Sequence, residues 1–360
     1  MPLQKITAAQ ALTQLQEFST VIDARSEGEY AEDHLPTAVN WPSLNDEERK
    51  QVGTEYKQIN AFEAKKRGAA MVARNVAAHI EREVLTKPKD WKPLVYCWRG
   101  GKRSGSLALI LDQIGFHTTL IEGGYKAFRA ALVEDIARLA PQFSYCVICG
   151  TTGSGKTRLL HALAAQGAQV LDLEGLACHR SSMLGVLPGQ PQPSQKQFDT
   201  RIWHALKQFD PQRVVYVESE SKKVGNVAVP EALMAAVRES PCLRLELPDD
   251  LRVQLLLQDY DFFVKDPEFF CDKLDALVTQ RGKPVINDWK DRVRTGRVNE
   301  VVAELLHKHY DPVYLSSMQR NFKQFDAAKL IAANAIDTPA YGQLALKILQ
   351  EHDQNHAETH

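Results

Sequence analysis

One stretch decides the fold of the first half of the chain: Leu94-Val95-Tyr96-Cys97-Trp98-Arg99-Gly100-Gly101-Lys102-Arg103-Ser104-Gly105-Ser106. It predicts a buried strand that ends at a cysteine, a tight loop with two glycines, and a helix that begins near Ser106. Backbone N–H groups in such a loop turn toward one point and form an anion site, and the helix adds its positive dipole end.

Three cations in this loop add full positive charge to the same site. Together with the N–H groups they favour a thiolate at Cys97, so we predict that Cys97 is the catalytic nucleophile. The predicted anion loop consists of Trp98, Arg99, Gly100, Gly101, Lys102 and Arg103. The alternative is a structural cysteine at a strand end, beside a solvated basic turn.

The composition is that of an ordinary globular protein. The chain has 360 residues, which is enough for two domains that each bury a core. A net charge of −1 excludes a uniformly basic nucleic-acid coat but permits a local basic patch. Six irregularly spaced cysteines and no signal-peptide pattern predict reduced thiols and a cytoplasmic protein. No run of about 18 apolar residues predicts a membrane span.

Short strands alternate with helices along the first half. Strands are predicted at 21–25, 94–96 and 118–121, and the loop 34–42 is predicted to feed another short strand. The segment 47–85 is predicted to be mostly helical with an interruption at 65–68. This alternation predicts a parallel sheet whose function lies at the carboxyl ends of the strands, which is where Cys97 lies.

A second phosphate-binding loop opens the second half. The apolar strand 143–148 runs into a G-x-x-x-x-G-K-T motif followed by an amphipathic helix. The predicted diphosphate-binding residues are Gly150, Thr151, Thr152, Gly153, Ser154, Gly155, Lys156 and Thr157. Lys156 neutralises the anion, and Thr157 is a candidate ligand for Mg²⁺. Cys146 and Cys149 have zinc-ligand spacing, but no second pair accompanies them, so we interpret them as core and turn cysteines.

Polar residues follow the next two predicted strands of this half. The candidate ligand or metal contacts are Asp172, Glu174, His179, Arg180, Glu218 and Glu220. A typical P-loop hydrolase has an aspartate where this chain has two glutamates, so the sequence assigns no certain metal and makes nucleotide hydrolysis less secure. The alternative is that these groups are solvated loop carboxylates.

Two basic segments are candidates for contact with an RNA backbone. They contain Lys65, Lys66, Arg67, Arg281, Lys283, Lys290, Arg292, Arg294 and Arg297. Lysine and arginine neutralise phosphates, and Trp289 in the second segment is a candidate for base stacking. A solvated charged face is the alternative for both segments.

Several motifs of the first half resemble a rhodanese domain over residues 1–135. They are Ile22-Asp23-Ala24-Arg25, Glu29-Tyr30, His34-Leu35-Pro36, Ala38-Val39-Asn40, Pro42, Cys97 and Gly123-Gly124. The resemblance implies that Cys97 carries sulfur or selenium as a persulfide or perselenide, whereas Asp23, Arg25 and His34 are structural. Cys97-x5-Arg103-Ser104 also fits a phosphatase loop, but Tyr96 stands where that pattern usually has a histidine.

The combination of both halves resembles the bacterial tRNA 2-selenouridine synthases. The matching motifs are 97–104, 123–126, 173–180 and 218–221, although Cys178 and Ser181 depart from the asparagine and glycine that we expect there. The resemblance implies action on the wobble 2-thiouridine of tRNAs for lysine, glutamate and glutamine. The sulfur is first alkylated from geranyl diphosphate, and the S-geranyl group is then displaced by selenium from selenophosphate.

These expectations also assign co-substrates and partner proteins, and they leave two alternative functions open. We assign the prenyl diphosphate to the Lys156 loop and selenophosphate to the Cys97 loop, with no tightly bound cofactor and with Mg²⁺ as a candidate. An enzyme that supplies selenophosphate is a candidate partner, and no membrane partner is expected. Two other functions stay open: a rhodanese-type sulfurtransferase regulated by a nucleotide-binding P-loop domain, and a non-catalytic tRNA-binding module, against which the intact Cys97 loop argues.

The predicted fold class is α/β with two parallel sheets. A rhodanese-like domain is expected at 1–140, because Pro141 ends the preceding helix. A P-loop NTPase-like domain follows at 141–310, and its last part is helical. A helical C-terminal extension with a disordered tail from 351 is expected at 311–360.

Overall fold

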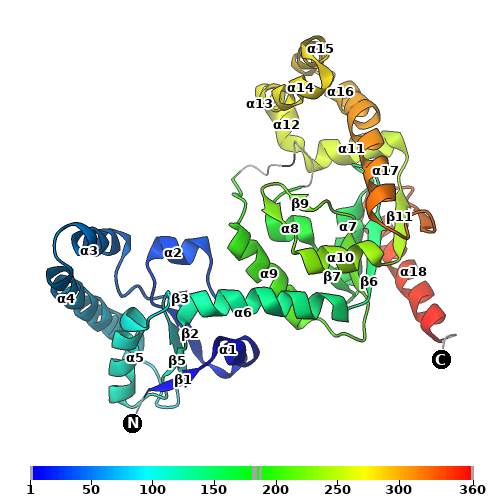
Figure 1. The fold of residues 1–360 in the computed structure, drawn as a ribbon. Helices are drawn as coiled ribbons and strands as arrows, with labels where there is room; N and C mark the ends of the chain where they lie inside the picture. The colour runs from blue at the N-terminus through cyan, green and yellow to red at the C-terminus, as the bar shows by residue number, and fades with distance from the viewer. Residues whose placement is uncertain (1–2, 181–184, 186–188, 358–360) are drawn as a thin grey trace. The chain divides into compact units, whose positions relative to one another are not determined.

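The computed structural model describes residues 3–180, 185 and 189–357. The chain forms two compact units, each with its own five-stranded parallel sheet (Figure 1). The first unit comprises Met1–Ile136 and Pro193–His204, and the second comprises Ala137–Gln192 and Ala205–His360. The α/β class with two parallel sheets is therefore confirmed, whereas a short segment from the second half of the chain belongs to the first unit.

The sheet of the first unit has the strand order β1-β5-β4-β2-β3. Its strands are β1 (Gln4–Ile6), β2 (Thr20–Asp23), β3 (Val39–Asn40), β4 (Pro93–Tyr96) and β5 (Thr119–Ile121). The helices are α1 (Ala8–Gln14), α2 (Glu27–Glu32), α3 (Asp46–Gln58), α4 (Ala61–His79), α5 (Lys102–Ile114) and α6 (Gly124–Leu139), with α9 (Gln195–Gln208) contributing its first turns. All four residues of the central strand β4 are buried, as expected for a parallel strand covered on both faces.

The long helical segment of this unit breaks earlier than the sequence predicted. Helix α3 ends before Ile59, and the side chain of Asn60 accepts the N–H groups of Phe62 and Glu63 to begin α4. The predicted interruption at 65–68 lies inside α4 instead. The boundary between α3 and α4 is therefore set by the N-cap asparagine and not by the lysine-rich run.

The sheet of the second unit has the strand order β12-β11-β6-β8-β7. Its strands are β6 (Tyr145–Cys149), β7 (Gln169–Leu171), β8 (Val215–Glu218), β11 (Cys242–Glu246) and β12 (Lys329–Ala332), and β9 (Lys223–Val224) pairs with β10 (Val227–Ala228) as a hairpin. The helices around the sheet are α7 (Lys156–Ala165), α8 (Leu173–Ala177), α10 (Glu231–Glu239) and α18 (Thr338–Ala357).

A helical part of the second unit lies between β11 and β12 in the sequence. It consists of α11 (Asp249–Asp259), α12 (Asp261–Lys265), α13 (Pro267–Leu274), α14 (Val278–Arg281), α15 (Lys283–Arg294), α16 (Val298–Leu305) and α17 (Asp311–Asn321). An apolar cluster that includes Phe270, Ile286 and Trp289 holds these helices together. Among the described residues, no helix is both long and apolar enough to cross a lipid bilayer.

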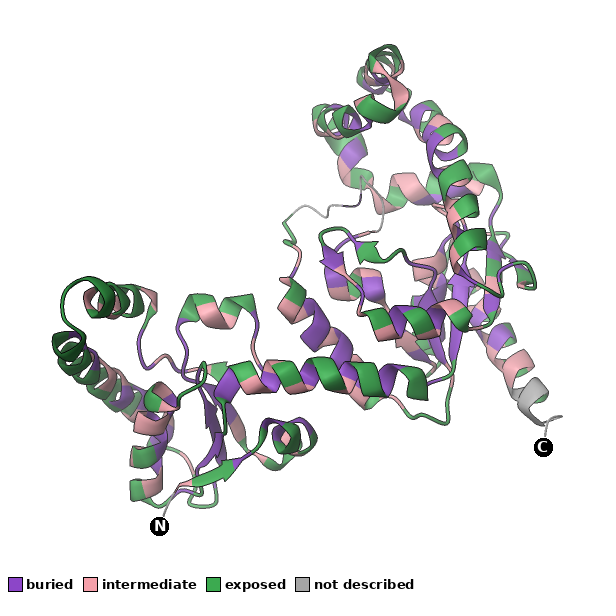
Figure 2. Ribbon diagram, viewed as in Figure 1, coloured by how far each residue is buried: buried purple, intermediate pink, exposed green. Residues whose placement is uncertain are grey.

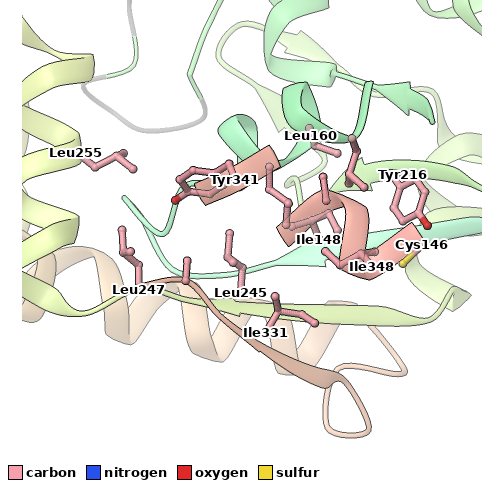
Figure 3. Packing of buried hydrophobic residues seen from close by; sticks show 14 residues of the cluster. Cys146, Ile148, Leu160, Tyr216, Leu245, Leu247, Leu255, Ile331, Tyr341 and Ile348 are labelled. Atoms are coloured by element: carbon pink, nitrogen blue, oxygen red, sulfur yellow. The ribbon is translucent and has the colours of Figure 1, made fainter. Parts of the chain in front are cut away.

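The C-terminal segment completes the second sheet. Strand β12 pairs in parallel with β11, and Tyr341, Ala345 and Ile348 of α18 are buried in the same core as Ile148 of β6 (Figure 3). Helix α18 continues to Ala357, so the tail from 351 to that residue is helical where we predicted disorder. Figure 2 shows the pattern that results: the inner strands of both sheets are buried, the outer strands β1 and β12 are largely exposed, and the helices expose one side. Residues 311–360 are thus part of the P-loop unit.

Candidate functional site

Cys97 lies at the carboxyl end of β4, where the loop to α5 begins. Its side chain is only 4% exposed, because it packs within the apolar cluster of the first unit. Its Sγ accepts a hydrogen bond from the hydroxyl of Ser104 at 3.2 Å. The carbonyl of Cys97 accepts the N–H of Tyr125 at 2.8 Å, and the carbonyl of Trp98 accepts the N–H of Lys126 at 3.0 Å. The start of α6 therefore fixes the start of the loop.

The residues of the predicted anion loop lie together in the structure, but Arg103 has a different contact from the one predicted. In the described part of the chain, the backbone N–H groups of residues 98–101 have no acceptor, and Arg99 and Lys102 are exposed. Arg103 instead forms an ion pair with Glu29 at 2.7 Å. Burial alone would raise the pKa of Glu29, but the hydrogen bond and charge of Arg103 hold it at about 2. Arg103 thus ties the loop to α2, and the two exposed cations remain for an anion.

A buried polar network supports the loop from below. Arg25 binds the carboxylate of Asp23 at 2.6 Å, and Tyr96 donates to the same carboxylate at 2.8 Å. Tyr125 donates its hydroxyl to Asp33 at 2.6 Å, as does Thr200 at 3.1 Å. Burial raises the pKa of Asp33, and these hydrogen bonds offset part of that rise. The residues that we interpreted as structural, Asp23 and Arg25, lie in this network.

The second predicted anion site is the loop between β6 and α7. Lys156 donates to the carbonyls of Gly150 and Thr151 at 3.0 and 3.4 Å, so its ammonium lies over the loop. The hydroxyls of Thr152 and Ser154 are buried and have no hydrogen-bond partner within the described ranges. Unsatisfied buried donors of this kind are costly unless a ligand accepts from them. The position of the Lys156 ammonium and the two unpartnered hydroxyls fit a phosphate-bearing ligand.

Three carboxylates gather beside this loop. One oxygen from each of Glu174, Glu218 and Glu220 lies within 4.8 Å of the others. The hydroxyl of Thr157 lies 3.3 Å from Glu174 and 3.4 Å from Glu218. Burial, followed by the charges of the neighbouring carboxylates, raises the pKa of Glu218 well above its usual value. A hard divalent cation fits this all-oxygen donor set.

Two cavities of different chemistry adjoin the P-loop within the second unit. The polar one is the larger, and its lining includes Lys156, Thr157, Arg158, Glu174 and Arg180. The apolar one is smaller. Its lining is Thr152, Leu256, Leu257, Tyr260, Phe263, Val264, Phe270, Val298, Val302, Leu305, Leu306 and Tyr310. Thr152, Leu256 and Tyr260 line both cavities, so they adjoin one another.

Two of the predicted ligand or metal contacts are engaged with other protein groups or buried, and their contact with a ligand stays a prediction. Asp172 caps α8 by accepting the N–H of Gly175 at 2.7 Å and also contacts His161. His179 is 7% exposed, and burial lowers its pKa. Neither residue is among the described residues that line the polar cavity. Cys178 adopts a left-handed conformation at the end of α8, and Ser181 lies outside the described residues.

The predicted RNA-binding cations are mostly engaged with other protein groups. Lys290, Arg292, Arg294 and Arg297 have acidic partners, and Arg281 donates to the carbonyl of Lys308. On α4, Lys66 and Arg67 pair with Glu63 and Glu55, and Lys65 lies near the ring of Tyr56. Trp289 is fully buried, so the base-stacking role that the sequence suggested for it is wrong. Phosphate contact by these cations stays a prediction.

Several residues that shape the sites were not assigned to them from the sequence. Glu29, Gly124 and Tyr125 belong to motifs that carry the family resemblance, but they lie in other elements, and only the fold shows that they shape the Cys97 loop. In the second unit, Arg158 binds Asp259 at 2.7 Å at the polar cavity. The aromatic run 260–263 was a usable signal for the apolar cavity, because aromatic side chains in short helices need a shared buried environment.

Comparison with known proteins relates each of the two units to a known domain family. A family model described as the tRNA 2-selenouridine synthase AAA domain matches residues 143–275, and a rhodanese-like domain model matches residues 7–131. The tRNA 2-selenouridine synthase of Nitrosomonas europaea is 38% identical in an alignment that covers 83% of this chain and 89% of that protein. The chain belongs to the tRNA 2-selenouridine synthase family.

Other members of the tRNA 2-selenouridine synthase family show the same extent of similarity. The one from a Sulfurovum species is 32% identical in an alignment that covers 89% of this chain and 93% of that protein. Among solved structures, a rhodanese-related protein from Thermoplasma volcanium is 18% identical and covers 35% of this chain and 89% of that chain, with a TM-score of 0.23. The rhodanese-like part of this family member holds Cys97, and the AAA part holds the Lys156 loop.

The contact between α6 and the Cys97 loop leaves no room for a side chain at Gly124. A Cβ there would lie 2.2 Å from the Cys97 carbonyl oxygen, at a φ of +58°. We expect Gly124→Ala to destabilise the protein by about 2 kcal/mol or more in urea unfolding. Gly100→Ala in the same loop is the matched control, because a Cβ there meets nothing within 4 Å. Equal stability of the two variants would contradict this interpretation.

Proposed function

We propose that this family member converts wobble 2-thiouridine of tRNA to 2-selenouridine in two steps. In the first, the thiocarbonyl sulfur attacks the first carbon of geranyl diphosphate, the carbon–oxygen bond breaks, diphosphate leaves, and the base loses its N3 proton. Alkylation turns a poor leaving group into a good one. The proposed substrates are the tRNAs for lysine, glutamate and glutamine, with selenophosphate and geranyl diphosphate as co-substrates. The relatives' shared name supports selenium transfer to tRNA.

The observation that carries the geranyl step is the pair of adjoining cavities. A prenyl diphosphate has a dianionic head and a branched hydrocarbon tail, and the two cavities offer a cradle for each. Lys156 and Arg158 supply charge in the polar cavity. Phe263, Phe270 and Val302 line the apolar one. Burial of hydrocarbon contributes roughly 0.8 kcal/mol per CH₂ group, so the tail adds several kcal/mol to binding.

A nucleotide suits this arrangement less well. Its base and ribose carry many hydrogen-bonding groups, whereas the apolar cavity has little besides Thr152 and two tyrosine hydroxyls to satisfy them. This argues against the alternative of a sulfurtransferase regulated by a nucleotide-binding P-loop domain. Phosphate binding itself does not distinguish the two ligands, because both carry a diphosphate.

A Mg²⁺ ion is the proposed companion of the diphosphate. Thr157, Glu174, Glu218 and Glu220 are the residues that would hold it. When bound, it would neutralise the departing diphosphate. The protein's own part is to orient the diphosphate with the loop N–H groups and Lys156, and to keep the carboxylate oxygens close together although they repel one another.

The selenium step is assigned to the Cys97 loop. The thiolate of Cys97 adds to C2 of the S-geranyl base and expels geranylthiolate; selenium of selenophosphate then displaces Cys97. Water cleaves the phosphorus–selenium bond, phosphate leaves, and N3 regains its proton. A perselenide on Cys97, which the rhodanese resemblance implies, would need a two-electron oxidant, because selenium in selenophosphate is already at the selenide level. Arg99 and Lys102 supply the charge for the tetrahedral anion.

Removal of the P-loop ammonium separates the two steps. We expect Lys156→Ala to slow geranylation of a 2-thiouridine RNA by roughly tenfold or more, because a charge-assisted contact with the diphosphate is lost. Selenation of an RNA that already carries S-geranyl-2-thiouridine is expected to continue at the wild-type rate. Both rates are measured by mass spectrometry of nucleosides, with Lys347→Ala on exposed α18 as the control. Loss of both activities, or of neither, contradicts the assignment.

Filling the apolar cavity tests the site of the prenyl tail. Val302 lines this cavity, so Val302→Trp is expected to weaken binding of geranyl diphosphate by about tenfold or more while leaving that of inorganic diphosphate unchanged. Val313→Trp, at an exposed position of α17, is the matched control. Titration calorimetry measures both ligands. Equal weakening of the two ligands by Val302→Trp would place the tail elsewhere.

A further inference from the structure

Trp98 differs from the other tryptophans of the chain in its exposure. Its side chain is 37% exposed, whereas the other four, Trp41, Trp91, Trp203 and Trp289, are 5% exposed or less. It directly follows Cys97 in the loop. More than a third of this indole stays open to solvent directly beside Cys97, and exposed aromatic rings beside cations are the usual platform for single-stranded bases.

The indole of Trp98 is supported from within the protein. It stacks on the ring of Tyr125, with the ring centroids 5.7 Å apart and the planes inclined by 30°. Tyr125 is 2% exposed and held by its hydroxyl on Asp33, and the guanidinium of Arg25 lies 3.8 Å from the Tyr125 ring centroid. The Trp98 carbonyl also accepts the N–H of Lys126. A platform fixed in advance loses little conformational freedom when a base stacks on it.

One cation lies near the Trp98 ring, and a second follows Trp98 in the loop. The ammonium of Lys196, on α9, lies 6.0 Å from the centroid of the Trp98 ring and pairs with Glu32 at 2.7 Å. Both side chains of that pair are well exposed, at 36% and 49%, so the pair is weak and Lys196 can exchange to a phosphate. Arg99 is exposed in the same loop and has no ion-pair partner in the part of the chain that the structure describes.

We propose that the nucleobase under modification stacks on the exposed indole of Trp98, and that Lys196 and Arg99 bind the phosphates beside it. This inference rests on the proposed function and deepens it, because it names the group that receives the base at the Cys97 loop. The base must leave its own stack to be modified, which costs free energy. Stacking on the indole offsets part of that free energy. It also replaces Trp289, which is buried, as the stacking residue.

Tryptophan fluorescence tests whether the base contacts Trp98, independently of any modification of the base. The probe is an anticodon stem-loop RNA with 2-thiouridine at its wobble position, titrated into the full chain. Because the other tryptophans are buried, we expect the RNA to quench the emission of Trp98 and expect Trp98→Phe to lose that change while still binding. Quenching that persists in Trp98→Phe overturns the proposal. Quenching by geranyl diphosphate alone also overturns it, since the indole would then hold the prenyl chain.

The kinetics of selenation test whether stacking on Trp98 contributes to the reaction. Stacking is worth about 1–3 kcal/mol per base, so Trp98→Ala and Trp98→Leu are expected to lower kcat/KM about tenfold or more, with Trp98→Phe close to wild type. Phe62→Ala, at a 67% exposed aromatic of α4, is the matched control. Iodoacetamide alkylation of Cys97 shows whether the loop is intact. If wild type modifies the RNA and Trp98→Leu equals it, the proposal fails; if wild type modifies nothing, the proposed function fails.

Discussion

The hydrogen bond from the Tyr125 N–H to the Cys97 carbonyl is the constraint on which the first site depends. It requires Gly124 to approach the loop backbone more closely than any side chain allows. The same tyrosine supports the Trp98 ring and reaches Asp33 with its hydroxyl. A single turn at the start of α6 therefore sets where the thiol, the anion loop and the exposed indole lie. The thiol is shielded from bulk water, while the loop cations stay in it.

The second site has the same architecture as the first. A central parallel strand, β6, ends in a glycine-containing loop, and α7 begins there, which is an arrangement that suits an anion. The difference lies in what surrounds the loop, because the helices between β11 and β12 add an apolar cavity next to the polar one. An anion-binding loop next to an apolar cavity suits a ligand with a charged head and a hydrocarbon tail. An anion-binding loop next to a thiol and an exposed aromatic ring suits a small anion and a nucleobase.

Features formed by residues close together in the sequence were predictable, whereas contacts between distant segments were not. Both anion loops were predictable, because strand, glycines and cations are contiguous in each. Arg103 was assigned to the anion, since no local signal shows that Glu29 lies opposite it. Trp289 looked available for stacking because its neighbours are charged, yet helical spacing places it in the core with Ile286 and Val293. The C-terminal segment was taken for an extension, because pairing of β12 with β11 is a long-range contact.

The central claim is that one chain performs a prenyl transfer and a selenium transfer with separate anion sites. Mass spectrometry of nucleosides tests it most directly, after a 2-thiouridine RNA is incubated with geranyl diphosphate and selenophosphate. The account predicts that the wild-type protein yields 2-selenouridine, with S-geranyl-2-thiouridine as the intermediate, and that Cys97→Ser accumulates the geranylated base. Formation of 2-selenouridine by Cys97→Ser at the wild-type rate, or without any geranylated species in the wild type, would contradict it.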